Sequence, residues 1–116
     1  MGRYWTTLDV RVIDDSGPRP YMYLLEPFQF ESEIVGVITI PAGFGFDGAS
    51  IPQECMSFTG WPGIRAACVH DWLVSTTVDR RVADRVFREA LEASQVNDQV
   101  ADLMYSAVAG YTRVMT

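Results

Sequence analysis

The sequence contains no lysine, and all nine of its basic residues are arginine. Fifteen acidic residues outnumber them and give a formal net charge of −6. Because such a surface repels a phosphate backbone, we expect no binding to nucleic acid. No apolar run approaches the roughly 18 residues that suggest a membrane-spanning helix. The N-terminus also lacks the apolar segment of an export signal, so we expect neither a membrane span nor a signal peptide.

Cysteine and histidine are also scarce, with Cys55, Cys68 and the single His70. The chain has no CxxC motif, and these residues do not follow the spacing of a zinc site. The two cysteines are compatible with one disulfide, but they favour two buried free thiols.

What the sequence does contain is enough apolar material for a core. Of its 116 residues, 48% are apolar and 21% are charged. This length and composition predict one domain that spans residues 1–116 and needs no disulfides for stability.

The first forty residues have the pattern of strands. Residues 4–13 alternate apolar and polar side chains from Leu8 onward, and residues 21–25, 28–33 and 34–40 are rich in aromatic and β-branched residues. The gaps are too short for helical crossovers, so we expect an antiparallel meander.

After Pro52 the apolar period becomes helical. We expect a helical turn at residues 53–58 and helices at about 64–75, 80–94 and from Asn97 or Asp98 to about Thr112, with Asp79 as an N-cap. The last helix should turn these residues inward: Val100, Leu103, Met104, Ala107, Val108 and Tyr111. The predicted fold class is α+β, an N-terminal antiparallel sheet of three to four strands packed against three to four C-terminal helices.

Between the two halves lies a loop, residues 42–52, in which glycines alternate with aromatic residues. Asp47 has two interpretations here. It accepts hydrogen bonds from the backbone of Ala49 and Ser50 in an Asx-turn, or it acts as a general base or metal ligand. Ser50 either caps the turn that follows or is a nucleophile, although its flanking residues do not form the G-x-S-x-G elbow.

His70, Asp71 and Asp84 complete the candidate site. His70 and Asp71 are neighbours on a helix, so their side chains point about 100° apart and hardly bond each other. Asp84 stands four residues after Arg80 and four before Arg88, which suits two ion pairs on the surface of the helix. It also stands three residues before Phe87, so it is a candidate to face inward. If it faces inward, its carboxylate needs a partner, and His70 or Arg65 is the natural one.

Two models fit these residues. In the first, Asp47, His70, Asp71 and Asp84 form a buried polar network that ties the loop to the helices. In the second, Asp47, His70 and Asp71 are catalytic, or Asp47, His70 and Asp84 bind a divalent metal. A divalent metal is the one cofactor that these residues suggest. Asp71 would then orient the histidine.

Three motifs resemble a family of small uncharacterised phage and prophage proteins. They are DG-x-S-x-P at residues 47–52, HD-x-L at 70–73 and AD-x-x-F-x-x-A at 83–90. The family often has Tyr after the second motif, where this chain has Val74. The resemblance implies a phage origin and directs attention to Asp47, Ser50, His70, Asp71 and Asp84 without assigning an activity.

We therefore expect a virion or tail-associated structural or accessory component, located in the virion or the host cytoplasm. Its partners would be other phage structural proteins or further copies of itself. Two alternatives stay open: a small metal-dependent hydrolase acting in lysis or entry, and a regulator that binds a host protein through an acidic face.

Overall fold

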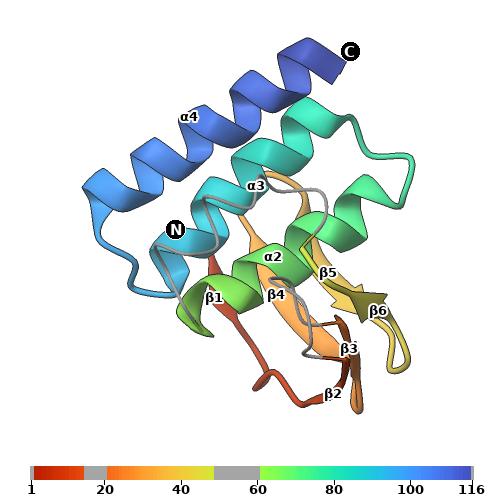
Figure 1. Cartoon of the computed structure of the whole chain (residues 1–116). Helices are drawn as coiled ribbons and strands as arrows, with labels where there is room; N and C mark the ends of the chain where they lie inside the picture. Colours follow the sequence, from red (N-terminus) through yellow and green to blue (C-terminus); the bar gives the residue numbers. More distant parts are fainter. Residues whose placement is uncertain (1, 15–20, 49–60, 116) are drawn as a thin grey trace.

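Six short strands precede three helices in the computed structural model, which describes residues 2–14, 21–48 and 61–115 (Figure 1). One sheet has the order β1-β4-β5 and consists of Arg3–Tyr4, Phe28–Ser32 and Gly36–Ile40. The other has the order β2-β3-β6 and consists of Val10–Asp14, Tyr21–Leu24 and Gly45–Phe46. All pairs are antiparallel, and the predicted α+β class is confirmed. The residues expected to form a helical turn at 53–58 lie outside the described part of the chain.

The strands form two sheets rather than the single meander that we expected. Residues 4–13, predicted as one strand, divide between them: Tyr4 pairs with Phe30 in the first sheet, and Val10 pairs with Leu24 in the second. Alternation along a sequence shows that a segment is extended, but it does not show where the segment changes partners. The loop that we expected at 42–52 likewise contributes a strand, because Phe46 of β6 pairs with Met22 of β3.

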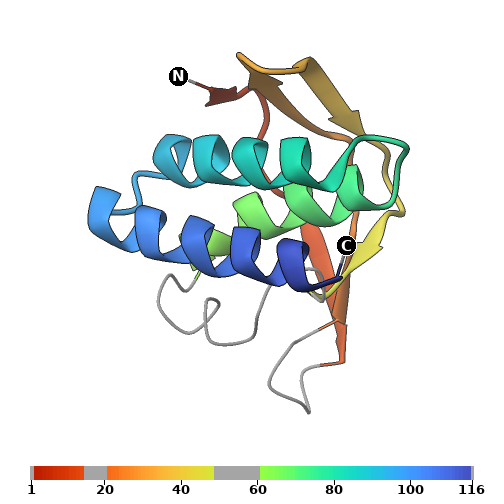
Figure 2. The same ribbon diagram turned by 90° about the horizontal axis from the view of Figure 1, so that it is seen from above.

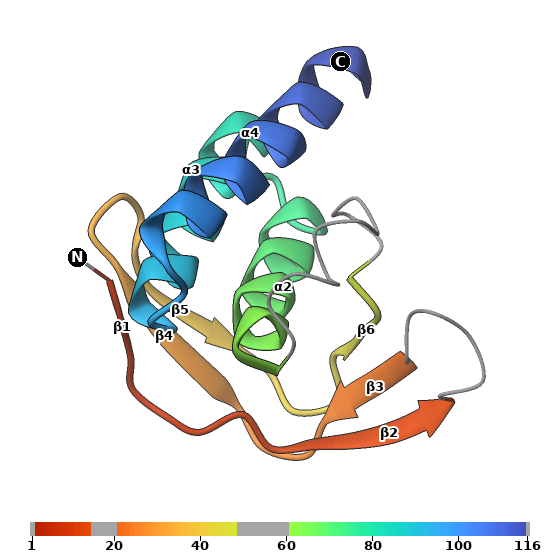
Figure 3. The ribbon, with the colours of Figure 1, turned by 60° about the vertical axis from the view of Figure 1, so that its left-hand side comes forward.

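The helices are α2 (Trp61–Val74), α3 (Arg80–Ala93) and α4 (Asp98–Met115). The predicted N-cap of α3 is confirmed, since the Asp79 carboxylate accepts the Arg81 N–H at 2.8 Å. Helices α2 and α3 pack against the β1-β4-β5 sheet, and α4 lies along α3 on the side away from it (Figures 2 and 3). Among the helices described, none is both long and apolar enough to cross a membrane.

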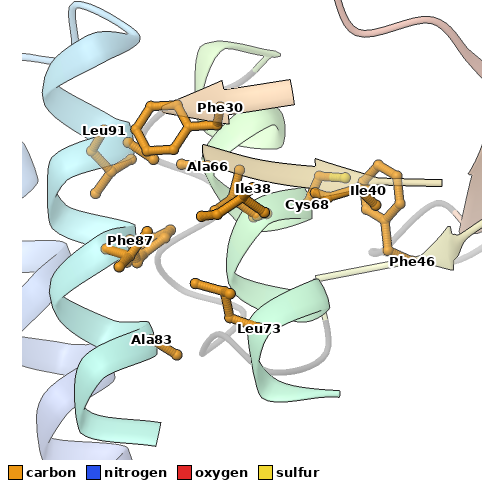
Figure 4. Packing of buried hydrophobic residues seen from close by; sticks show 14 of the residues in the cluster. Phe30, Ile38, Ile40, Phe46, Ala66, Cys68, Leu73, Ala83, Phe87 and Leu91 are labelled. Atoms are coloured by element: carbon orange, nitrogen blue, oxygen red, sulfur yellow. The ribbon is translucent and has the colours of Figure 1, made fainter. Parts of the chain in front are cut away.

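The core lies between the β1-β4-β5 sheet and the two helices above it. Phe30 of β4 and Ile38 of β5 face Phe87 and Leu91 of α3, while Ala66 lies on α2 (Figure 4). Strand β4 alternates between buried and half-buried residues, as a strand with one covered face must. The small residues Ala66, Ala67 and Cys68 of α2 are all buried, and their size allows a close approach of its neighbours.

Helix α4 corrects part of the predicted core. Leu103 and Tyr111 were expected to face inward, but they are 57% and 40% exposed, and Ala107 is exposed as well. The buried residues form a narrower stripe along the helix than the predicted one. They are Ala101, Met104, Val108 and Thr112. Helix α4 packs mainly on α3. Because a single neighbouring helix covers only part of its circumference, fewer positions are buried than in a helix that is surrounded by a core.

Two leucines test this orientation of α4. We expect Leu91→Ala on α3 to lower the free energy of unfolding by about 2–5 kcal/mol, because it opens a cavity at a fully buried side chain. The same substitution at Leu103 should cost less than about 0.5 kcal/mol. Urea denaturation followed by circular dichroism measures both. Equal losses would contradict the orientation of α4 described above.

Candidate functional site

Three helices contribute to a polar network that contains two of the residues that the sequence singles out, His70 and Asp84. His70 on α2 lies with its Nε2 atom 2.6 Å from Oδ1 of Asp84 on α3. The other carboxylate oxygen of Asp84, Oδ2, accepts the hydroxyl of Thr112 on α4 at 2.5 Å. Thr112 in turn accepts the Nε–H of Arg80 at 3.1 Å. We call His70, Asp84, Thr112 and Arg80 the three-helix network.

The centre of this network is buried. The side chains of His70 and Asp84 are 0% and 2% exposed, and the ring of Phe87 lies 5.3 Å from the imidazole. A carboxylate removed from water is costly unless it is paired and hydrogen-bonded, and both oxygens of Asp84 have partners. The sequence offered His70 or Arg65 as the partner of an inward Asp84, and the structure pairs Asp84 with His70.

Asp71 ties the loop to α2. Its Oδ2 atom accepts the backbone N–H of Gly48 at 2.8 Å. Gly48 has a φ of +78°, a left-handed conformation that favours glycine. In this contact the helix supplies the carboxylate that accepts the hydrogen bond, and the loop supplies the N–H group that donates it.

Asp47, next to this contact, is half-buried at the end of β6. Its predicted Asx-turn with Ala49 and Ser50 falls outside the described residues, as do both roles proposed for Ser50. The catalytic roles of Asp47, His70 and Asp71 stay predictions.

A metal site needs several ligands that converge. Within residues 2–14, 21–48 and 61–115, no three His, Cys, Asp or Glu side chains are grouped so that they could hold a metal ion. The histidine and carboxylate that do meet, His70 and Asp84, form a pair. The metal role suggested for Asp47, His70 and Asp84 stays a prediction.

Two nucleophilic side chains outside the network are buried or partly buried, and burial lowers their reactivity. Cys68, a free thiol one turn before Trp72, is buried, and desolvation, followed by the nearby charge of Asp71, raises its pKa. Burial likewise raises the pKa of Tyr4, whose hydroxyl donates to the Ala90 carbonyl at 3.0 Å. Both groups are therefore neutral near pH 7, and the thiol is a poor nucleophile.

A second buried carboxylate, Glu89 of α3, was not anticipated from the sequence. It accepts the Ser32 hydroxyl at 2.6 Å and the Glu33 backbone N–H at 2.7 Å. Ser32 also accepts the N–H groups of Ile34 and Val35, at 3.0 and 3.2 Å. This contact joins α3 to the turn between β4 and β5. The sequence does hold a sign that Glu89 is buried, because it lies between Phe87 and Ala90, which are on the buried side of α3.

Thr112 was also missed as a site residue. It lies four residues after the buried Val108, so helical periodicity places it on the inward face of α4. That position could have indicated a buried hydroxyl in need of a partner.

The fold and its site define a small α+β domain in which buried hydrogen bonds connect the helices and a partly buried one connects the loop to α2. Residues 22–108 match the model of a family described as protein of unknown function, DUF1353. The chain belongs to this family.

One relative places the domain in a longer chain. The chain is 35% identical over 103 residues to the uncharacterized protein y4jT of Sinorhizobium fredii (strain NBRC 101917 / NGR234). The match covers 84% of this chain, which spans only 30% of that relative's length. No solved structure matches the chain significantly.

Two aspartates test the importance of the three-helix network. Asp84→Asn keeps the shape of the side chain and removes its charge, so we expect a loss of about 1.5–3 kcal/mol in the free energy of unfolding. Asp102→Asn is the matched control. Asp102 accepts Arg88 at 2.8 Å on the surface, with 71% of its side chain exposed, and its substitution should cost less than about 1 kcal/mol.

Chemical denaturation in the same buffer measures both variants. A loss at Asp84 no larger than that at Asp102 would show that the buried pair contributes little to stability.

Proposed function

We propose that the protein is a non-enzymatic structural or accessory component of a phage or prophage particle, associated with the virion or its tail. In this proposal the cluster of Asp47, His70, Asp71 and Asp84 joins the loop to the helices and carries out no reaction. The phage origin rests on the resemblance of the three sequence motifs. The non-enzymatic role rests on the geometry of the cluster.

The observation that carries the proposal is the inward direction of the three-helix network. A general base must come within hydrogen-bond reach of the proton that it removes. Asp84 uses its two oxygens on His70 and Thr112, and neither His70 nor Asp84 has appreciable exposed surface. Such an arrangement fixes the relative positions of helices, which is what a component of an assembly requires.

The surface of the β2-β3-β6 sheet supports a role in assembly. Strand β2 lies at the edge of that sheet, and its Val12 and Ile13 are exposed. An edge strand offers unpaired backbone groups to another chain, and apolar side chains beside it add area that association can bury. A neighbouring subunit that covers β2 would use both.

The relative from Sinorhizobium fredii supports a modular role. The matched region makes up 30% of that protein, so a domain of this kind occurs joined to other sequence. A domain used in this way can attach or position its neighbours without catalysing a reaction of its own.

Particle composition tests the proposal. After prophage induction in the host that carries the gene, we expect the protein to sediment with purified particles and to be detected in them by mass spectrometry. An Asp47→Asn variant that folds normally, as judged by its thermal melt, should be incorporated equally well, because an assembly component does not need that carboxylate for chemistry.

Two other results would count against the proposal. A protein that stays monomeric and is absent from purified particles would contradict the proposal. A metal that copurifies in stoichiometric amount without chelators, and is lost in a folded Asp47→Asn variant, would favour the hydrolase instead.

A further inference from the structure

A pocket of about 370 Å³ lies between α3 and α4, on the surface beside the three-helix network. The two helices run side by side (Figure 2). The lining residues come from both of them: Arg81, Asp84, Arg85, Tyr105, Ala109 and Arg113. This size falls within the range of about 300–1,000 Å³ that is common for small-molecule sites.

The pocket collects positive charge in an acidic protein. Three of the nine arginines line it, although the chain as a whole has a formal net charge of −6. Arg3 and Arg88, elsewhere on the surface, have carboxylate partners. Within the described part of the chain, no carboxylate lies within 4.0 Å of the guanidinium nitrogens of Arg81, Arg85 or Arg113.

Asp84 is the one acidic residue of the lining, and it does not neutralise these arginines directly. Its two oxygens bond His70 and Thr112 on the buried side of α3. The three guanidinium groups therefore outnumber the carboxylate and keep their hydrogen-bond donors available to a ligand.

The helix ends do not explain this arrangement. Arg113 in the last turn of α4 is favoured by the negative end of the helix dipole. Arg81, however, lies in the first turn of α3, where the positive end of the helix dipole disfavours a cation. The N-cap carboxylate of Asp79 stands at the same end, but it accepts the backbone N–H of Arg81 at 2.8 Å. A bound anion would offset the repulsion among these groups.

We infer that this pocket binds a small organic phosphate, a phosphate monoester with an apolar body. Guanidinium groups donate paired hydrogen bonds to phosphate oxygens, and three of them suit a dianion. Tyr105 and Ala109, both half-buried, provide a wall for the body of the ligand. The site goes beyond the proposed particle role and would exist whether or not the protein is part of a particle.

Titration calorimetry of the full chain with phenyl phosphate at low ionic strength tests the inference. Because hydrogen bonds between charged groups are strong, Arg81→Gln, Arg85→Gln and Arg113→Gln should each weaken binding about tenfold or more. Arg11→Gln is the control. It removes the same charge from an exposed position on β2, outside the pocket, and should change the dissociation constant by less than about twofold.

Ala109→Phe tests the pocket apart from its charge. The larger ring should fill the space for the apolar body and weaken binding of phenyl phosphate, while inorganic phosphate still binds to the arginines. Thermal melts identify any variant that fails to fold. Phenol, which has no phosphate, should not bind the wild-type chain.

Three results would overturn the inference. They are the absence of saturable phenyl phosphate binding at low ionic strength, equal weakening by Arg11→Gln and the three pocket variants, and equal binding of phenol and phenyl phosphate. The second would indicate attraction to the whole surface, and the third would indicate an apolar site without a role for the arginines.

Discussion

The arrangement of the helices depends on the burial of one carboxylate. Asp84 has almost no contact with water, so it must obtain hydrogen bonds from the protein. One comes from His70 on α2 and the other from Thr112 on α4. Because Thr112 must face Asp84, α4 is held at a rotation that turns Tyr111, the preceding residue, toward solvent. The narrow apolar stripe of α4 is therefore a consequence of a polar contact as well as of packing.

Helix α3 carries a second buried carboxylate, which fixes its position relative to the strands. Glu89 follows Asp84 by five residues, which corresponds to a rotation of about 140° around the helix. Asp84 consequently connects α3 to the other helices, whereas Glu89 connects it to Ser32 and the turn after β4. Hydrophobic contact holds these layers together without direction, and the two carboxylates restrict how they can be rotated against each other.

The sequence predicted the parts of this design that depend on local periodicity. The strand and helix segments and the Asp79 cap follow from alternation and helical spacing, whereas spacing left Asp84 open between the surface and the interior. The division of residues 4–13 between two sheets does not, because partner choice depends on strands far along the chain. Thr112 and Glu89 were missed for the same reason: spacing identifies the face of a helix, but not the distant group that a polar residue on that face will meet.

The inner and outer sides of the contact between α3 and α4 are chemically linked through Asp84. On the inner side its carboxylate accepts Thr112, and on the outer side its residue borders the arginine pocket. An anion held by Arg81 and Arg113 would bridge the same two helices that Thr112 and Asp84 already join. The unfolded chain lacks this arrangement of arginines, so such a ligand would stabilise the folded state by mass action. The buried carboxylate would then set the geometry of a surface site without contacting the ligand through its own oxygens.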